Sequence, residues 1–268
     1  MQETCHWIQK RVGGEWLGSV ADRHLLVDGV STDTRMPMTN RLFVPLVGTR
    51  FDGHDFLEEA VKQGAAAALW QRDHPHPASP PIPLILVDDT LTALQELAAA
   101  VRREWEIPVI GVTGSNGKTT TKELIAAVLS SRYRVHKTEG NLNNHIGLPL
   151  TLLSAPPDAE AAVVEMGMNH RGEIARLSQL AAPDIGVITN VGEAHLEFLG
   201  SREGIAEAKL EIREGLSAKG TLIIHGDEPL LTERIPSDAR KVIRIGWGKA
   251  NDDFPRDLTL SETGISFR

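Results

Sequence analysis

The chain has 268 residues, of which 41% are hydrophobic and 24% charged, and its formal net charge is -8. This composition is that of a soluble globular protein with room for two domains, and the acidic balance argues against nucleic acid as the main partner. The single cysteine excludes a disulfide framework, and no apolar run is long enough for a signal peptide or a membrane span. We therefore expect a cytoplasmic protein without membrane insertion.

The first part of the chain predicts a small α/β domain over residues 1–88. The apolar run 41–48 is typical of a buried strand closed by Gly48. Within the segment 55–69, Phe56, Leu57, Ala60 and Val61 share one helical face, which predicts a helix with Gly64 as its C-cap. The proline-rich stretch 74–83 indicates a surface loop, and a further strand follows it.

A helix that Asp89 or Thr90 can cap is expected from residue 89, as the connector to a second domain over 89–268. Continuous apolar strands then alternate with helices, which favours a mostly parallel sheet covered by helices on both faces. The strands are expected near 108–114, 133–138, 159–167, 183–192 and 220–231.

The stretch GVTGSNGKTTTKEL, residues 111–124, indicates a phosphate-binding loop, although Val112 stands where the usual pattern has its first glycine. The backbone N–H groups of the loop can form an anion-binding nest at the start of a helix. The expected nucleotide-binding residues are Gly114, Ser115, Asn116, Gly117, Lys118, Thr119 and Thr120. Lys118 can reach the β- and γ-phosphates, and the Thr119 hydroxyl can ligate Mg²⁺. The alternative is an ordinary glycine-rich turn.

Polar side chains further along the chain are compatible with a site at the same edge of the sheet. Glu165 ends a buried strand, where ligands bind in open α/β sheets, although a solvated carboxylate explains its position equally well. His195 follows another strand, and a lone histidine is more often a surface residue. Lys209 falls in a helical segment, where a lysine is usually solvated. Asn143 and Asn144 belong to an asparagine-rich loop.

Polar turns in the first domain offer a second set of candidates. The segment STDTR and the segment VGTRFDGHDF combine hydroxyl, carboxylate, arginine and histidine side chains. Arginine binds diphosphates in forked geometry, whereas position alone favours plain polar turns. The candidate substrate contacts are Ser31, Thr32, Asp33, Arg35, Gly48, Arg50 and His54.

Four segments together resemble the Mur ligases, which build the peptidoglycan stem peptide. They are VTGSNGKTTTKE, EGNLNNHIGLPLTLL, VVEMGMNHRGEI and ITNVGEAHLEFLGSREGIAEAKLEI. The segment STDTRMPMTNRLFVPLVGTRFDGHDF is similar to the UDP-sugar domain of that family, so the resemblance covers nearly the whole chain. The family's loop has the form T-G-x-x-G-K-T, in which Val112 is normal.

The resemblance implies a role for each candidate residue. Residues 1–88 would bind the UDP-sugar, with the first-domain candidates facing uracil and diphosphate, and residues 89–268 would form the ATP-binding domain. Mg²⁺ ions, one or two, would be held by Thr119, Glu165, His195 and Lys209. The last of these would serve as a CO₂-derived carbamate, and both the carbamate and the free amine stay open. The catalytic residues implied are Lys118, Asn143, Asn144, His195 and Lys209.

The implied reaction is an ATP-dependent amide ligation in peptidoglycan precursor synthesis. The carboxylate of UDP-N-acetylmuramoyl-tripeptide would attack ATP, and the amine of D-alanyl-D-alanine would attack the resulting acyl phosphate. The alternatives are a relative that adds a single amino acid, a folylpolyglutamate synthase, a P-loop kinase, or a non-catalytic ATP- or UDP-sugar-binding fragment. The sequence ends at SETGISFR, whereas family members continue, so we expect little or no turnover from these residues alone.

Overall fold

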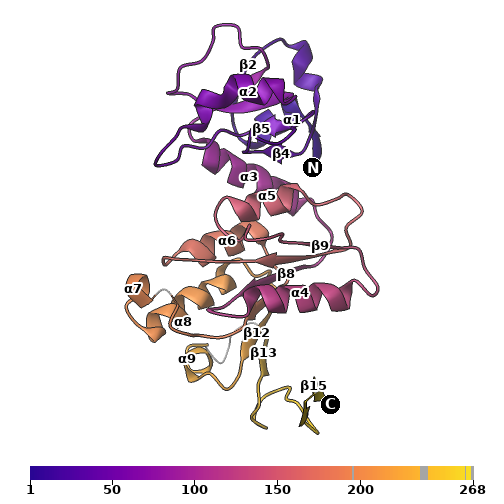
Figure 1. Cartoon of the computed structure of the whole chain (residues 1–268), viewed down its shortest axis with the longest axis vertical. Coiled ribbons are helices and arrows are strands. Elements are labelled where there is room, and N and C mark those ends of the chain that lie inside the picture. The colour runs from indigo at the N-terminus through magenta and orange to yellow at the C-terminus, as the bar shows by residue number, and fades with distance from the viewer. Residues whose placement is uncertain (195, 236–240, 263, 267–268) are drawn as a thin grey trace. The chain divides into compact units, whose positions relative to one another are not determined.

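The protein is described by a computed structural model that covers residues 1–194, 196–235, 241–262 and 264–266 (Figure 1). The chain divides into two compact units. The first unit comprises Met1–Glu106 and His145–Ala159, and the second comprises Ile107–Asn144 and Glu160–Arg268. Helix α3 (Thr90–Arg103) groups with the first unit, whereas the sequence interpretation placed it at the start of the second.

The first unit is built on a five-stranded sheet with the order β2-β7-β6-β5-β4, in which only β2 is antiparallel to its neighbour. A separate antiparallel pair joins β1 to β3. The strands are β1 (Gln2–Thr4), β2 (Glu15–Leu17), β3 (Leu26–Asp28), β4 (Val30–Ser31), β5 (Leu42–Phe43), β6 (Ala67–Gln71) and β7 (Leu84–Val87). The α-helices are α1 (Cys5–Arg11), α2 (Leu57–Lys62), α3 and α5 (Gly147–Leu153), with 3-10 turns η1 (Ala21–His24) and η2 (Gly53–Phe56).

Local sequence signals explain most of these elements. Asp89 caps α3 by accepting from the Thr92 backbone N–H at 2.6 Å. Gly64 follows α2 with a φ of +94°, as its role at the helix end requires. The strand expected over 41–48 is confined to Leu42–Phe43, because Pro45 has no N–H to continue the ladder. The core beneath the sheet contains Phe43, Trp70 and Leu84.

The second unit is built on a six-stranded, fully parallel sheet with the order β13-β12-β11-β8-β10-β9. The strands are β8 (Val109–Thr113), β9 (Val135–Lys137), β10 (Ala161–Glu165), β11 (Ile185–Ile188), β12 (Thr221–His225) and β13 (Val242–Ile245), and β14 (Thr259–Ser261) pairs with β15 (Gly264–Ser266). The helices are α4 (Lys118–Leu129), α6 (Glu173–Ala181), α7 (Leu196–Leu199), α8 (Arg202–Leu210) and α9 (Pro229–Thr232), with the 3-10 turn η3 (Glu211–Glu214).

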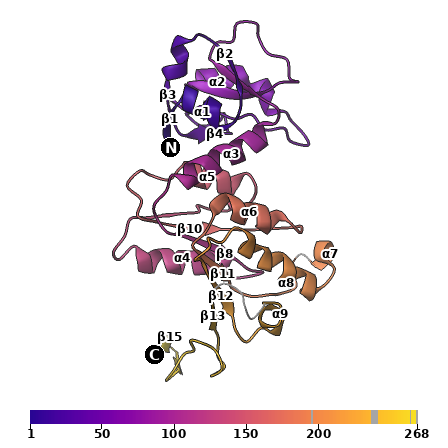
Figure 2. The same ribbon diagram turned by 180° about the vertical axis from the view of Figure 1, so that it is seen from behind.

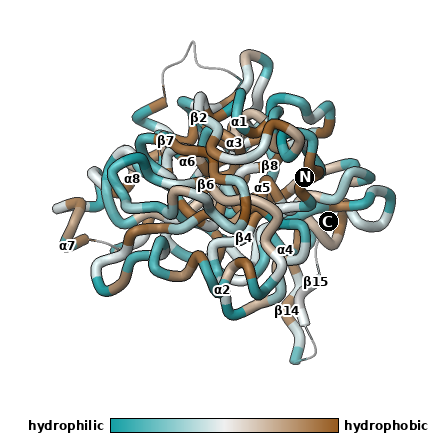
Figure 3. Tube along the Cα trace, turned by 90° about the horizontal axis from the view of Figure 1, so that it is seen from above, coloured by the Kyte–Doolittle hydropathy of each residue, from teal (hydrophilic) through white to brown (hydrophobic). Residues whose placement is uncertain are grey.

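The parallel sheet expected from the sequence is confirmed. Strands β8 and β10 are buried along their whole length, as a sheet covered on both faces requires. The chain runs from β8 to β9 on one side of β8 and later from β10 to β11 on its other side, and right-handed crossovers in these two directions place helices on both faces. Figure 2 shows α4 and α8 on opposite sides of the strands. In Figure 3, the apolar residues follow the inner segments of the chain, and the outer loops are largely polar.

The strand order determines where the functional residues meet. Strand β8 lies between β10 and β11, which come later in the sequence and run parallel to it. The carboxyl ends of these three strands therefore share one edge of the sheet, at the point where the order of connections reverses. This is the place where ligands bind in open α/β sheets.

Candidate functional site

A glycine-containing loop joins β8 to α4 at this edge. Gly114 has a φ of +150° and Gly117 a φ of +75°. A Cβ on Gly114 would overlap the Thr189 side chain, so only glycine fits there, whereas the space beside Gly117 is open. Gly117 forms the N-cap of α4 without a side-chain hydrogen bond, which leaves the first-turn N–H groups directed out of the helix.

The loop is fastened to the end of β11 by residues that the sequence interpretation missed. The Ser115 N–H donates to the Asn190 carbonyl at 3.2 Å, and the Asn116 N–H donates to Asn190 Oδ1 at 3.0 Å. The Thr189 hydroxyl donates to the Asn116 carbonyl at 2.6 Å. These three hydrogen bonds fix the shape of the loop, and two of them use the Ser115 and Asn116 N–H groups that the sequence interpretation assigned to the nucleotide. The signal for them is the polar Thr-Asn pair that follows an apolar strand.

Glu165 lies beside the loop as the sequence predicts. Glu165 is 2% exposed, and its carboxylate accepts from the Thr119 hydroxyl at 2.9 Å and from Asn143 Nδ2 at 2.8 Å. Its backbone N–H donates to Thr138 Oγ1 at 2.9 Å. The structure therefore brings together three residues that are far apart in the sequence. Alcohol, carboxylate and amide groups form a donor set that suits Mg²⁺.

Two lysines complete the described part of this cluster. Lys118 Nζ donates to the Gly114 carbonyl at 2.9 Å, so the amine lies over the loop. Lys209, on α8, is 1% exposed, and burial together with the nearby charge of Lys118 lowers its pKa to about 7. The usual solvated helical lysine does not describe Lys209, which is instead a buried amine next to a cation.

Two further residues predicted from the sequence have different outcomes. Asn144 is exposed on the loop that carries Asn143. His195 lies outside the described residues, so its predicted role as a metal ligand stays a prediction.

The polar candidates of the first unit follow the carboxyl ends of β4 and β5, two adjacent parallel strands. Ser31 and Thr32 are partly buried. Arg35 binds Asp33 through two bonds of 2.8 and 2.6 Å, and these bonds lower the pKa of the Asp33 carboxyl to about 2. Gly48 and Arg50 are exposed on a tight turn, in which the Gly48 N–H donates to the Phe51 carbonyl at 3.0 Å.

His54 is engaged inside the first unit. Its Nδ1 lies 2.6 Å from Asp52 Oδ1, and its Nε2 accepts from the Gln71 backbone N–H at 3.2 Å. Because Nε2 is an acceptor, Nδ1 carries the proton, and burial lowers the pKa of His54. His74 contacts carboxylates of Asp52 and Asp73 with both ring nitrogens at 2.8 Å, which favours its doubly protonated form.

The group Asp52, His54 and His74 has metal-ligand chemistry, since its donor atoms lie within 4.8 Å of one another. However, a metal at Nδ1 of His54 would have to displace the proton of a ring whose other nitrogen already accepts a hydrogen bond. We therefore interpret the group as a proton-sharing network that joins the turn η2 to the loop after β6.

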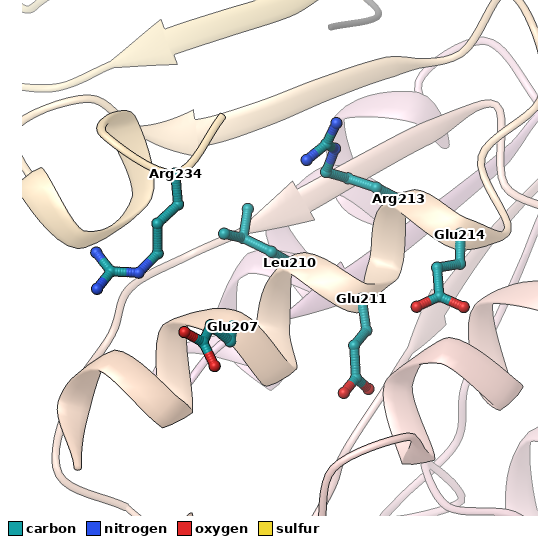
Figure 4. A pocket seen from close by; sticks show the side chains of 6 residues that line it. All are labelled: Glu207, Leu210, Glu211, Arg213, Glu214 and Arg234. Carbon is teal, nitrogen blue, oxygen red and sulfur yellow. The ribbon is translucent and has the colours of Figure 1, made fainter. Parts of the chain in front are cut away.

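A pocket in the second unit has a lining that includes no residue of the phosphate loop. It is lined by Glu207, Leu210, Glu211, Arg213, Glu214 and Arg234 (Figure 4). The Glu211 carboxylate already accepts from the Gly172 and Ala175 N–H groups at 2.8 and 3.2 Å. These bonds give Glu211 a structural role at the start of α6. None of the lining residues was predicted from the sequence, and none supplies the chemistry of the phosphate loop.

The geometry of the second unit defines a P-loop domain on a parallel sheet. The model of the Mur ligase middle domain matches residues 112–268, and the model of the Mur ligase family, catalytic domain, matches residues 26–102. The chain therefore belongs to the Mur ligase family.

Individual relatives support this assignment. The chain is 56% identical over 242 residues to UDP-N-acetylmuramoyl-tripeptide–D-alanyl-D-alanine ligase of Bacillus subtilis, covering 90% of this chain and 52% of the relative. It is 42% identical over 252 residues to the enzyme of that name from Escherichia coli, covering 93% of this chain and 55% of the relative. The chain thus spans about half the length of the curated relatives it matches.

Solved structures agree with the fold. A crystal structure of MurF from Acinetobacter baumannii matches with a TM-score of 0.85 and 30% identity, covering 100% of this chain and 60% of that one. The MurF ligase of Thermotoga maritima, crystallised with ADP, matches with a TM-score of 0.80 and 34% identity. This match covers 90% of this chain and 55% of that one. Among the residues that the structure describes, no helix combines the length and apolar character needed to cross a membrane.

Proposed function

We propose that the chain forms the ATP- and UDP-sugar-binding parts of a ligase that joins D-alanyl-D-alanine to UDP-N-acetylmuramoyl-tripeptide. The names of the relatives support this substrate pair, and the ADP in the Thermotoga structure supports an adenine nucleotide. The cytoplasmic location expected from the sequence belongs to the same proposal. The second unit would bind ATP, and the first unit would bind the UDP-sugar.

The observation that carries the proposal is the position of Glu165 at the phosphate loop. Its carboxylate touches both the Thr119 hydroxyl of the loop helix and Asn143 of the asparagine-rich loop. A carboxylate and an alcohol at a phosphate loop suit the Mg²⁺ of a bound nucleotide. Mg²⁺, when bound, would neutralise phosphate charge and polarise the γ-phosphoryl group.

The residues of the chain would act mainly by positioning and charge compensation. Attack of a carboxylate on a triphosphate brings two anions together, and the loop N–H groups and Lys118 would offset that repulsion. Lys118 would exchange the Gly114 carbonyl for phosphate oxygens. Asn143 and Asn144 would face the γ-phosphate and the attacking carboxylate. The resulting acyl phosphate would be attacked by the dipeptide amine, which releases phosphate.

Lys209 and His195 extend the same site in this proposal. A buried amine with a pKa of about 7 is largely uncharged in mildly basic solution, which is the form that reacts with CO₂. A carbamate on Lys209 would replace a cation beside Lys118 with an anion able to hold a second Mg²⁺. Labelling with ¹³C-bicarbonate should give a carbamate carbonyl signal that is lost in Lys209→Arg. A spectrum without that signal in the unsubstituted chain would leave Lys209 as an amine.

The first-unit residues would contact uracil and diphosphate. Ser31 ends β4, and Asp33 and Gly48 follow the ends of the adjacent parallel strands β4 and β5, which is where a ligand meets such a sheet. Arg50 is exposed and available for a diphosphate. Arg35 is paired with Asp33, and His54 is bonded within the unit, so their proposed contribution is to hold the turns in shape.

Calorimetric titration tests the two binding sites separately. ADP with Mg²⁺ should bind the chain, and Lys118→Met should remove most of that binding. Lys219→Met, at an exposed lysine of the same unit, is the matched control and should bind normally. UDP-N-acetylmuramoyl-tripeptide should bind independently of Lys118. Absence of ADP binding in the unsubstituted chain would refute the nucleotide assignment.

Product analysis tests the reaction and separates the family members. Any turnover should give ADP and a UDP-linked pentapeptide together, and only when ATP, the tripeptide substrate and D-alanyl-D-alanine are all present. The 268 residues alone should give little or none. A relative that adds a single amino acid would instead respond to one member of an amino-acid panel. A kinase would leave a phosphorylated product and no free phosphate.

A further inference from the structure

We propose that Lys122 is a positioning residue of the phosphate-loop site, acting through Thr138 on Glu165 and Asn143. The inference rests on the nucleotide and Mg²⁺ function proposed above. Lys122 is not among the residues assigned to nucleotide or Mg²⁺ binding above, because its amine bonds to the Thr138 carbonyl and pairs with Glu123. Its role follows from the way in which strand β9 ends.

Lys122 is a buried cation one helical turn after Lys118. Its side chain is 1% exposed, and Nζ donates to the Thr138 carbonyl at 2.6 Å. It also pairs with Glu123 at 3.0 Å, and Glu123 in turn pairs with Lys137. Burying an ammonium group is costly unless it is paired and hydrogen-bonded. An apolar residue would cover the strand at lower cost, so the charge indicates a specific polar task.

That task is visible in the hydrogen bonds between β9 and β10. In a parallel ladder, a residue donates to one residue of its neighbour and accepts from the residue two positions farther along. The Thr138 N–H donates to the Val163 carbonyl at 3.0 Å, so the Thr138 carbonyl is the regular acceptor for the Glu165 N–H. Lys122 occupies that carbonyl instead, and the Glu165 N–H donates to Thr138 Oγ1 at 2.9 Å.

This exchange has two consequences at the site. It fixes the backbone of Glu165 through a side-chain hydroxyl, while the carboxylate of the same residue reaches Thr119 and Asn143. It also interrupts the ladder at Thr138, one residue after β9 ends at Lys137, and the chain then enters the loop that carries Asn143. The Asn143 carbonyl accepts from the N–H of Gly167, two residues after the end of β10, at 2.8 Å. Lys122 thus determines where both partners of the carboxylate–amide contact are placed.

The experiment measures how Mg²⁺ changes the affinity of the 268-residue chain for ADP, by calorimetry with EDTA and with increasing Mg²⁺. In Lys122→Met, ADP affinity without Mg²⁺ should stay within about twofold, because the loop amides and Lys118 are intact. The gain in affinity that Mg²⁺ gives should fall by about tenfold, as is typical when a partner of a metal-binding residue is removed. Lys137→Met removes a cation that pairs with the same Glu123 and should change neither value.

A second pair of substitutions tests the same path without removing the buried charge. Thr138→Val deletes the hydroxyl that holds the Glu165 N–H and should reproduce the loss seen in Lys122→Met. Thr138→Ser keeps the hydroxyl and should restore the Mg²⁺-linked gain. Because Thr138 and Lys122 act in series, the double variant should lose little more than either single variant. If Lys122→Met does not fold, the Val and Ser variants decide the question.

Each result has a distinct meaning. A full Mg²⁺-linked gain in Lys122→Met, or in Thr138→Val, overturns the positioning role. An equal loss with and without Mg²⁺ also overturns it, because Lys122 would then stabilise the domain in general. An unsubstituted chain whose ADP affinity does not respond to Mg²⁺ contradicts the proposed function itself. A selective loss with rescue by serine supports the inference.

Discussion

The hydroxyl of Thr119 donates to the carboxylate of Glu165 across 2.9 Å, which joins the first turn of α4 to the end of β10. These residues are separated by 46 positions in the sequence. The contact exists because β10 lies directly beside β8, from which the phosphate loop emerges. The carboxylate therefore lies at the start of α4, directly beside the phosphate loop.

Glu165→Gln tests whether this carboxylate binds the metal of the nucleotide. Glutamine keeps the size of the side chain and removes its charge, so Mg²⁺-linked ADP affinity should fall by more than about tenfold. The measurement is calorimetry with and without Mg²⁺. Glu160→Gln removes a carboxylate just before the amino end of β10, which accepts from the Arg134 N–H, and should leave the gain intact. An unchanged gain in Glu165→Gln would remove this residue from the metal site.

Gly114→Ala tests the shape of the loop through stability. The new Cβ would overlap the Thr189 side chain and stand at a φ of +150°, so we expect a loss of about 1–3 kcal/mol from backbone strain, with the overlap adding to it. Thermal unfolding should show a lower Tm. Gly140→Ala, at a φ of +53° with open space around it, should cost about 1–2 kcal/mol. Equal losses of stability in Gly114→Ala and Gly140→Ala would contradict the conclusion that only glycine fits at position 114.

Lys209 predicts a pH dependence of stability in CO₂-free buffer. Burial lowers its pKa to about 7 in the folded chain, from 10.5 in the unfolded chain. Between these values the unfolded state binds more protons, so the free energy of unfolding should rise with pH by about 1.4 kcal/mol per unit. Lys209→Met should lose this rise, and the exposed Lys219→Met should keep it. Denaturant unfolding at several pH values is the measurement. If the free energy of unfolding rises with pH equally in Lys209→Met and in the unsubstituted chain, the prediction is refuted.

For His74, in the first unit, we expect stability to depend on pH with the opposite sign. Bonds to Asp73 and Asp52 raise the pKa of His74 above its ordinary 6.5. The stabilisation that protonated His74 gives to the folded state is therefore fully present below pH 6.5. It is lost as the pH rises through the raised pKa of His74. The neighbouring His54, whose pKa is lowered by burial, instead destabilises the fold when the pH falls.

His74→Gln should therefore lose stability at low pH and approach the unsubstituted chain at higher pH. The exposed His76→Gln is the control and should follow the unsubstituted profile. The readout is the urea midpoint across the range from mildly acidic to mildly basic solution. A constant difference between His74→Gln and the unsubstituted chain at every pH would contradict the assignment of His74 as the titrating group.

The sequence predicts those features that depend on neighbouring residues. The strand, loop and helix around Gly114 and Gly117 follow from local patterns, as does the Asp89 cap. Glu165 was predicted at a strand end because the apolar run before it is uninterrupted. The resemblance to the Mur ligases, carried by several motifs, is confirmed.

Features that depend on strand order were missed. Asn190 and Thr189 support the phosphate loop only because β11 lies next to β8, and the sequence does not state that order. Lys122 looks like any lysine on a helix until β9 is placed beneath it. His54 was expected among the substrate contacts, and its bonds to Asp52 and to the Gln71 N–H could not be read from the sequence.

The first unit is also discontinuous in sequence, and this has a practical consequence for dissecting the protein. Helix α5 returns to it from residues 145–159, where the His145 carbonyl accepts from Gln95 at 3.0 Å and the Leu153 carbonyl from the amino terminus at 2.9 Å. A recombinant fragment ending at residue 106 would omit that helix and expose the apolar surface it covers. An autonomous version needs residues 145–159 grafted back through an engineered linker, as in a circular permutant.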